Sequence, residues 1–166
     1  MTNLRTLVCA LALLALSACG FQLRGSGSAY NMPFKTIYLA FPDNSSLGTE
    51  LRRNLRGSDK VEVVADPAKA EATFEVVSEG RSKAILSLNS QGRVREYMLT
   101  YTLVFRVRDA KGEEVLGATE IMLKRPLTFN EAQVLAKESE EALLYRDMQT
   151  DLVQQILRRL AAVKPT

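Results

Sequence analysis

An uninterrupted alternation of side chains between Tyr97 and Val107 constrains the fold of this chain more than any other feature. Apolar residues occupy every second position of the run: Tyr97, Leu99, Tyr101, Leu103, Phe105 and Val107. Successive side chains of a β-strand point to opposite faces, so this period of two predicts a strand with one face in a hydrophobic core. We expect the intervening side chains on the other face: Met98, Thr100, Thr102, Val104, Arg106 and Arg108.

Two turn sequences border this strand and predict a neighbouring strand on each side. Asn89-Ser-Gln-Gly92 stands before it, and Asp109-Ala-Lys-Gly112 after it offers a glycine suited to positive φ. The segment from Ala72 to about Leu88 is expected to bend near Gly80, and Val115–Lys124 is expected to return as the next strand. The three strands together predict an antiparallel meander.

The segment before the meander predicts a strand, a helix and a second strand. Runs rich in β-forming residues lie at Lys35–Phe41 and Lys60–Val64. Between them, an apolar residue recurs every four positions and places three leucines on one helical stripe: Leu47, Leu51 and Leu55. This order within about 30 residues suggests a right-handed crossover that joins two parallel strands.

A long helix is predicted at the C-terminal end of the chain. Asn130 is expected to begin it, with Gln133 as a capping-box partner, and Pro165 to end it. Its expected apolar face comprises Leu135, Ala142, Tyr145, Met148, Leu152, Ile156, Leu160 and Val163. The elements predict an α+β fold in one domain over residues 34–164. Two helices pack on one face of a four- to five-stranded, mixed and mostly antiparallel sheet.

The N-terminal segment has the features of a lipoprotein leader. Its apolar run, Leu7–Leu16, contains ten residues, whereas a helix that crosses a hydrocarbon core needs about 20. The run leads into Leu16-Ser-Ala-Cys19, which matches a lipobox. We therefore predict a signal peptide at residues 1–18. Cys19 would carry a diacylglyceryl group and a further acyl chain such as palmitate, and residues 19–33 would form a tether.

The residue after Cys19 bears on where such a protein is retained. In lipoproteins of bacteria with two membranes, Asp at this position commonly keeps the protein in the inner membrane, but here the residue is Gly20. We therefore expect the outer membrane, at its periplasmic face. Two or more acyl chains hold a protein firmly in a bilayer, so the lipid on Cys19 would be a stable anchor.

Composition removes several classes of chemistry. The chain has no histidine and only two cysteines, Cys9 in the leader and Cys19, so histidine-based catalysis and histidine metal sites are excluded. It also lacks the spacings of dinucleotide-binding, P-loop and EF-hand motifs. The net charge is only +3, which does not indicate a nucleic-acid partner. We predict a non-enzymatic protein without metal or cofactor, apart from the covalent lipid on Cys19.

Basic side chains gather on the predicted hairpins and suggest a ligand with phosphates and acyl chains. Arg106, Arg108, Lys124 and Arg125 lie at one end, and Arg81, Lys83, Arg93 and Arg95 flank the turn at the other. Arginine binds phosphate in a bidentate manner, and apolar groups between the two ends could accept lipid. Alternatively, these charges protect strand edges and keep the protein soluble. The trio Arg52, Arg53 and Arg56 either complements a helix dipole or binds a ligand.

The assembled motifs resemble the LPS-assembly lipoprotein family, LptE. The resemblance begins at Cys19-Gly-Phe-Gln-Leu-Arg-Gly25 and continues through Gln91–Tyr97 with its Glu96-Tyr97 pair. It ends with Asn130–Lys137, an acidic stretch and Arg146-Asp-Met148. Each motif alone is weakly specific, but their order agrees across essentially the whole chain after the leader.

The resemblance implies a function in lipopolysaccharide transport. Members of this family sit as a plug inside a large outer-membrane β-barrel, form with it the translocon of the Gram-negative envelope, assist its assembly and bind lipopolysaccharide. One family position carries over directly, because Lys137 matches a lysine linked to lipopolysaccharide binding. The second implicated basic residue lies in a hairpin turn where this chain has Asn89 and Ser90, with Arg93 and Arg95 slightly later.

We therefore expect lipopolysaccharide to be bound by Lys137, Arg93, Arg95, Arg106, Arg108 and Lys124. For Lys137, the alternative is an ion pair with Glu141 one helical turn away. The leading hypothesis is an outer-membrane lipoprotein that partners a β-barrel and acts as plug, assembly factor and lipopolysaccharide binder. The second is an auxiliary lipoprotein of an envelope phospholipid-trafficking system. The third is an envelope hydrolase that uses carboxylates, although no paired acids stand in a defined setting.

Overall fold

The computed structural model describes residues 31–57 and 60–163. The expected signal peptide, Cys19 and the tether as far as residue 30 lie outside the described residues. In chain order the elements are β1 (Thr36–Ala40), α2 (Ser46–Arg56), β2 (Glu62–Val64), the 3-10 turn η1 (Pro67–Lys69), β3 (Ala72–Leu88), β4 (Val94–Asp109), β5 (Glu114–Thr128), the 3-10 turn η2 (Glu131–Gln133) and α3 (Val134–Ala161).

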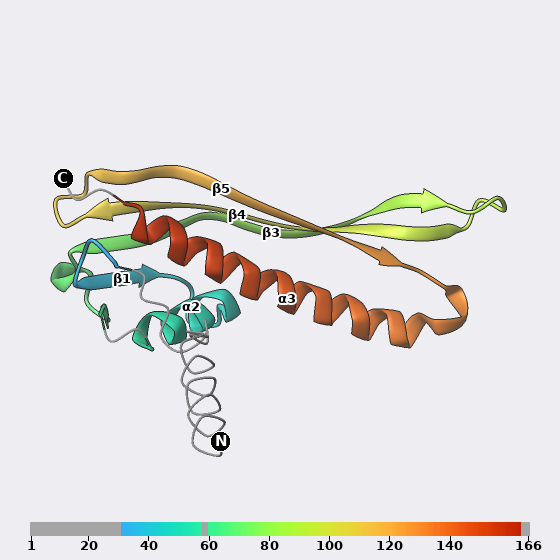
Figure 1. Ribbon diagram of the computed structural model, residues 1–166, viewed down its shortest axis with the longest axis horizontal. Coiled ribbons are helices and arrows are strands. Elements are labelled where there is room, and N and C mark those ends of the chain that lie inside the picture. The colour runs from blue at the N-terminus through green and yellow to red at the C-terminus, as the bar shows by residue number, and fades with distance from the viewer. Residues whose placement is uncertain (1–30, 58–59, 164–166) are drawn as a thin grey trace, which may run out of the picture.

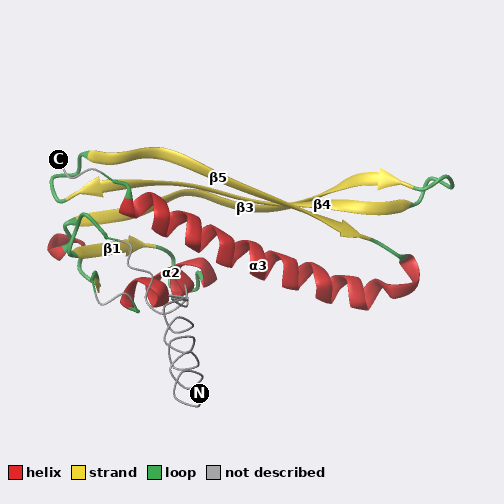
Figure 2. Ribbon diagram, in the orientation of Figure 1, coloured by secondary structure: helices red, strands yellow, loops and turns green. Residues whose placement is uncertain are grey.

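The five strands form one mixed sheet in the order β2-β1-β3-β4-β5, with both helices on the same side of it (Figures 1 and 2). β1 pairs in parallel with β2 and with β3, whereas the β3-β4 and β4-β5 pairs are antiparallel. The predicted α+β class, the parallel pair joined by a helix and the antiparallel meander are therefore confirmed.

The core lies between the helices and the face of β4 that the alternation predicted. Its members on β4 are completely buried: Leu99, Tyr101, Leu103, Phe105 and Val107. The leucine stripe of α2 and the second half of α3 cover these side chains. The covering residues are Leu47, Leu51, Leu55, Met148, Leu152, Ile156 and Leu160. Burying an apolar side chain of this size contributes about 1.5–3 kcal/mol, so this layer holds the fold together.

A stack of three phenylalanine rings fixes the position of α2. The ring centroids of Phe41 and Phe74 lie 5.4 Å apart, and those of Phe74 and Phe105 lie 4.9 Å apart. A Cβ atom at Gly48 would lie only 2.6 Å from Cγ of Phe41. The first turn of α2 can approach the stack closely because this position has no side chain. Ser45 caps the same turn by accepting a hydrogen bond from the Gly48 N–H at 3.0 Å.

The β3-β4 hairpin continues well beyond the short strand beside it. β1 pairs with β3 only as far as Glu75, so the β1 side of the later part of β3 has no strand partner among the described residues. From Val77 to Leu86 every residue of β3 is exposed. We call residues 77–98 the hairpin arm, and the part around β1, β2, α2 and residues 72–76 of β3 the base. In Figure 1 the tip of the arm projects beyond the rest of the sheet.

Three local predictions were wrong. The β3-β4 register shifts between Val76 and Ser78 and twice more between Ile85 and Leu88, whereas Gly80 pairs regularly with Thr102. Asn130 caps η2 by accepting a hydrogen bond from the Ala132 N–H, so no capping box with Gln133 forms. Leu135 does not belong to the buried face of the last helix, since it is 80% exposed.

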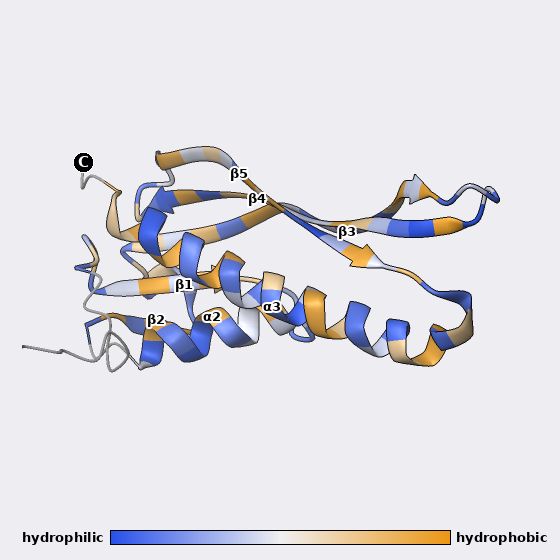
Figure 3. Ribbon diagram, turned by 45° about the vertical axis from the view of Figure 1, so that its right-hand side comes forward, coloured by the Kyte–Doolittle hydropathy of each residue, from blue (hydrophilic) through white to orange (hydrophobic). Residues whose placement is uncertain are grey.

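Leu135 is exposed because of the direction of α3. Its buried residues begin at Met148, because only the second half of the helix faces the base. The first half runs out along the sheet toward the arm end (Figure 1). Figure 3 shows hydrophilic and hydrophobic segments next to one another along the hairpin arm.

Candidate functional site

Three basic residues that the sequence singled out lie on neighbouring segments near one end of the molecule. Phe129, the residue after β5, donates its backbone N–H to the carbonyl oxygen of Arg95 at 2.8 Å. Its neighbour Thr128 accepts a hydrogen bond from Nζ of Lys137 at 3.1 Å. Arg93 lies two residues before Arg95 at the start of the hairpin strand. We call Arg93, Arg95 and Lys137 the arm-end cluster.

The turn at the tip of the arm explains how Arg93 is positioned. Asn89 accepts backbone N–H bonds from Gln91 and Arg93 through Oδ1, each at 2.9 Å. Gly92 completes the turn with φ of 76°, a conformation that a residue with a Cβ atom rarely adopts. The Arg93 side chain then reaches Glu131 at 3.2 Å and remains 62% exposed. It is therefore held loosely and is accessible from solvent.

Arg95 and Lys137 are held differently. The β3-β4 register passes from Ser87↔Glu96 to Leu88↔Val94, so Arg95 has no register partner on β3 and forms no ion pair within the described residues. Lys137 pairs with Glu140 at 2.7 Å and its side chain is only 16% exposed. The expected pair of Lys137 with Glu141 was wrong, because Glu141 instead bonds Lys83 at 2.6 Å.

A shallow pocket of about 550 Å³ lies beside this cluster. Its lining comes from the hairpin turn and from the segment that joins β5 to α3, and comprises Asn89, Gln91, Arg93, Val94, Arg95, Phe129, Asn130, Glu131 and Ala132. Two guanidinium groups and the ring of Phe129 stand beside one carboxylate, so the pocket offers phosphate-binding and apolar surface together.

Exposed apolar side chains surround the same end of the molecule and were not identified from the sequence. On the arm they are Ile85, Leu86 and Leu88, and at the start of α3 they are Val134, Leu135 and Leu143, all at least 41% exposed. The available signal was length: a strand of 17 residues next to one of 5 must extend past its partner. Exposed apolar groups gathered in one region mark a contact surface.

The other predicted basic residues lie elsewhere. Arg106 and Arg108 are roughly 36 to 44 Å from Arg95 along β4, on the sheet face away from the helices. Arg106 bonds Glu75 at 2.6 Å and Glu114 at 3.3 Å, and Arg108 lies 3.6 Å from Glu75 and 3.9 Å from Glu114. The Glu75 hydrogen bond raises the pKa of Arg106. Two carboxylates thus balance two arginines there.

Arg108 and Lys124 differ from the arm-end cluster in their surroundings. Nε of Arg108 is buried without a hydrogen-bond partner in the described part of the chain, so the long contact to Glu75 compensates it only partly. Lys124 is exposed and stands opposite Thr100 on the uncovered face of the sheet, at neither end. The structure therefore groups Arg93 and Arg95 with Lys137, but not with Arg106, Arg108 or Lys124.

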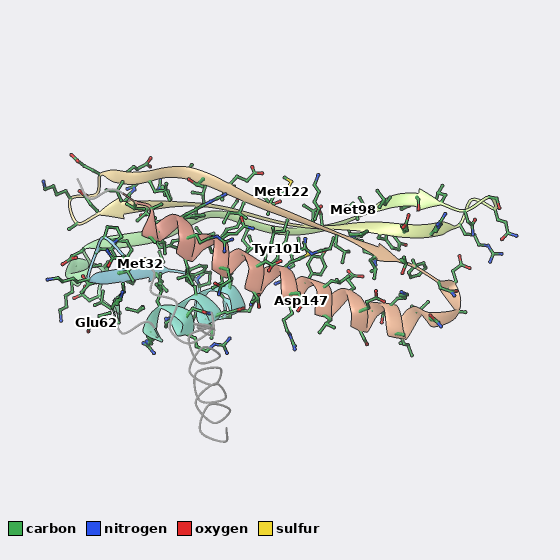
Figure 4. All side chains as sticks on the ribbon, in the orientation of Figure 1. Met32, Glu62, Met98, Tyr101, Met122 and Asp147 are labelled. Atoms are coloured by element: carbon green, nitrogen blue, oxygen red, sulfur yellow. The ribbon has the colours of Figure 1, made fainter. Side chains whose placement is uncertain are left out.

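A polar network under the root of the arm was also missed. Tyr101 donates its hydroxyl to Glu79 at 2.5 Å, and Arg81 bonds both the Tyr101 hydroxyl and Oε1 of Gln149. Gln149, a buried residue of α3, donates a hydrogen bond from its side-chain amide to Glu50 of α2 at 2.7 Å. Figure 4 places Tyr101 between the sheet and α3. The network ties β3, β4 and both helices together where β3 leaves β1.

The same network changes the acidity of two tyrosines. Burial, together with the hydrogen bond and charge of Glu79, raises the pKa of Tyr101 to about 12 against the opposing effect of Arg81. Burial also raises the pKa of Tyr145, with the charge of Glu141. Both hydroxyls therefore stay protonated near neutral pH, which suits structural donors and not general bases.

The described residues contain no group of three or more carboxylate, histidine or cysteine side chains placed to bind a metal ion. Among the same residues, no helix combines the length and the apolar composition that crossing a bilayer requires.

The chain is similar to known lipoproteins over most of its length. It is 29% identical over 163 residues to the LPS-assembly lipoprotein LptE of Pectobacterium atrosepticum, covering 97% of this chain and 86% of that one. It is 26% identical over 158 residues to the LptE of Yersinia enterocolitica, covering 95% and 75%.

Solved structures agree. The solution structure of lipoprotein B from Nitrosomonas europaea, described as uncharacterized, matches with a TM-score of 0.73 and 43% identity, covering 86% of this chain and 91% of that one. The crystal structure of the rare lipoprotein B from Shewanella oneidensis matches with a TM-score of 0.68 and 26% identity, covering 77% and 95%. The family model described as LptE, Lipopolysaccharide-assembly, matches residues 34–160. The chain therefore belongs to the LptE lipopolysaccharide-assembly family, and the resemblance drawn from its motifs is confirmed.

Proposed function

We propose that this protein is a non-enzymatic lipoprotein of the outer membrane that partners a large β-barrel and helps to place lipopolysaccharide in the outer leaflet. In this role it acts as a plug inside the barrel, as an assembly factor for the barrel and as a lipopolysaccharide binder. Lipid on Cys19 anchors it at the periplasmic face. The proposal extends its membership of a lipopolysaccharide-assembly family to particular partners and to particular residues.

One observation supports the lipid-binding part most strongly. Arg93, Arg95 and Lys137 come from two distant parts of the sequence, yet their segments are joined at Thr128 and Phe129 by bonds of 3.1 and 2.8 Å. Lipopolysaccharide carries phosphates and several acyl chains. Cations beside exposed leucines and isoleucine offer a complementary surface, because arginine and lysine bind phosphate and the apolar groups accept hydrocarbon.

The surface of the sheet supports the barrel-binding part. The helices cover only one face (Figure 2), and the other face carries small and hydroxyl side chains, among them Ser82, Thr100 and Thr102. Met122 on that face is 49% exposed. An elongated molecule with one uncovered sheet face and a long strand edge that has no partner among the described residues is suited to lie against the inner wall of a wider protein.

Depletion of the protein in its native host tests the proposal. We expect lipopolysaccharide at the cell surface to fall and the barrel to accumulate in a misfolded form, and the protein to co-purify stoichiometrically with the barrel from detergent. Unchanged surface lipopolysaccharide and a normally folded barrel, together with a loss of phospholipid asymmetry, would favour the phospholipid-trafficking alternative instead.

Complementation of the depleted cells separates the two roles. A variant with Arg93→Gln, Arg95→Gln and Lys137→Gln should still co-purify with the barrel but restore surface lipopolysaccharide poorly. Arg106→Gln with Arg108→Gln is the matched control and should restore both. If the arm-end variant restores surface lipopolysaccharide fully, these three residues do not mediate the contact with lipid.

A further inference from the structure

The cations of this chain differ in whether they have a partner. Lys83, Arg93, Arg106, Arg108, Arg125 and Lys137 each form an ion pair with a carboxylate. The other cations form none within residues 31–57 and 60–163; among them, Lys35, Arg56 and Lys60 are all exposed and line one pocket. We call these three residues the basal cluster.

The basal cluster is assembled from three separate elements. Lys35 directly precedes β1, Arg56 ends α2 and Lys60 precedes β2, and together they line an open pocket of about 730 Å³. A backbone bond of 2.8 Å from the Glu62 N–H to the Lys35 carbonyl oxygen joins the two strand starts. Among the described lining residues of this pocket, three cations stand with one carboxylate, Glu62.

A purely structural role accounts for only part of this cluster. Arg56 lies in the last turn of α2, where a cation is stabilised by the helix dipole. Lys35 and Lys60 do not belong to a helix, so the dipole does not explain them. The carboxylate of Glu71 accepts the Lys35 backbone N–H at 2.7 Å and forms no ion pair with its ammonium group. Unbalanced like charges gathered on one surface attract an anionic partner.

The position of the cluster indicates which anionic surface it meets. The chain enters the domain at Met32 and Phe34, which pack on the core, and Lys35 follows at once. Figure 4 shows Met32 and Glu62 at the same end of the molecule, away from the arm tip. The segment from Cys19 to Lys35 spans at most about 55 Å when fully extended, so a lipid anchor on Cys19 would keep this end near the bilayer.

We propose that the basal cluster binds the anionic phospholipid headgroups of the leaflet that holds the anchor, as a second and electrostatic attachment. This inference rests on the lipid anchor of the proposed function. Juxtamembrane lysine and arginine residues are attracted to anionic headgroups within a Debye length of the surface. The attachment would orient the base toward that leaflet and direct the hairpin arm away from it.

Vesicle binding by the full exported chain with Cys19→Ser tests the proposal without the covalent lipid. We expect it to bind vesicles of phosphatidylcholine with phosphatidylglycerol and to leave vesicles of phosphatidylcholine alone unbound. The triple variant Lys35→Gln, Arg56→Gln and Lys60→Gln should bind the anionic vesicles on the order of a hundredfold more weakly. Circular dichroism of the variant should match the parent and thermal unfolding should stay close to it, since these side chains form no ion pair in the described part of the chain and only Arg56 loses its interaction with the helix dipole.

Lys111→Gln is the control that separates the cluster from net charge. Lys111 is an exposed cation in the β4-β5 turn, at the opposite edge of the sheet from β2, and its loss should change binding by less than about twofold. Arg158→Gln and Lys124→Gln, added to it, match the triple variant in charge. Inorganic phosphate should compete no better than chloride at equal ionic strength.

Three outcomes would overturn the proposal: equal binding to neutral and anionic vesicles, unchanged binding by the triple variant, or preferential displacement by inorganic phosphate. A triple variant that keeps vesicle binding but no longer co-purifies with the barrel would assign the cluster to a protein contact instead. Because the vesicle assay contains neither barrel nor lipopolysaccharide, its failure leaves the proposed function standing. Conversely, failure of the depletion experiment leaves vesicle binding unaffected.

Discussion

The base and the hairpin arm use the same two strands for different purposes. In the base, β3 lies between β1 and β4, and Phe74 and Phe105 are completely buried in the ring stack. In the arm, β3 loses β1, and Ile85 and Leu88 are 59% and 54% exposed. One β-hairpin therefore provides both a folded core and a surface available for contact. The change occurs at the bulge around Val77.

The largest contrast between the two regions should appear in stability. Phe105→Ala removes the ring that stacks on Phe74 and leaves a cavity in the core, so it should lower the free energy of unfolding by about 3–5 kcal/mol. Ile85→Ala in the arm removes a mostly exposed side chain and should change it by less than about 1 kcal/mol. Urea unfolding measures both. Equal effects would mean that the arm is packed as tightly as the base.

The root of the arm should respond to alkaline pH through Tyr101. The pKa of its hydroxyl is raised from 10.0 to about 12 by burial and by Glu79, so the folded state keeps a proton that the unfolded state releases. Its contribution, of roughly 2–3 kcal/mol, is fully present below pH 10 and is lost as the pH rises toward 12. Unfolding by urea across this range measures the slope.

Tyr101→Phe supplies the control for that experiment. The variant has no titratable hydroxyl at this position, so it should lose the part of the pH slope that the parent shows between pH 10 and 12. The remaining slope belongs to the other tyrosines and to the lysines. Identical slopes in the two proteins would show that the pKa of Tyr101 is not raised by folding.

The two glycine turns provide the smallest and sharpest comparison. Gly92 at the arm tip and Gly112 at the other end of β4 have φ of 76° and 85°, and a Cβ atom at either position would meet open space. Alanine should therefore cost about 1 kcal/mol of local strain at each. We expect Gly112→Ala to lower global stability by that amount and Gly92→Ala by less, because the arm can open locally without unfolding the base.

Hydrogen exchange distinguishes the two glycine variants residue by residue. Gly92→Ala should speed exchange mainly in the strands beside the turn, whereas Gly112→Ala should lower protection throughout the base. Equal losses of global stability would show that arm and base unfold as one unit.

The alternation in β4 allowed the fold to be predicted because each strand position has only two possible faces. Every apolar position from Leu99 to Val107 is buried as expected. The exposure of Leu135 could not be predicted in this way. A helical stripe indicates which residues share a face, but not how far along the helix a neighbour covers it. The length of the arm depended similarly on where β1 stops.

The candidate site was predicted only in part because ion pairs depend on distances between elements. The sequence suggested an ion pair between Lys137 and Glu141. In the structure Glu141 pairs with Lys83 of β3, and Lys137 pairs with Glu140. Arg106 and Arg93 look alike in sequence, since each begins an Arg-Val-Arg run. The first is balanced by Glu75 and Glu114 from two neighbouring strands, whereas the second has only Glu131.

The most direct test of the division between base and arm is lipopolysaccharide binding by two matched sets of variants. Arg93→Gln, Arg95→Gln and Lys137→Gln together remove the arm-end cluster, and Arg106→Gln with Arg108→Gln remove the balanced pair nearer the base. We predict that the first set weakens binding on the order of tenfold or more, as loss of charge-assisted bonds implies, while its urea midpoint stays unchanged. The second set should bind as the parent does. Equal weakening by both sets, or weakening by the second set alone, would contradict the account.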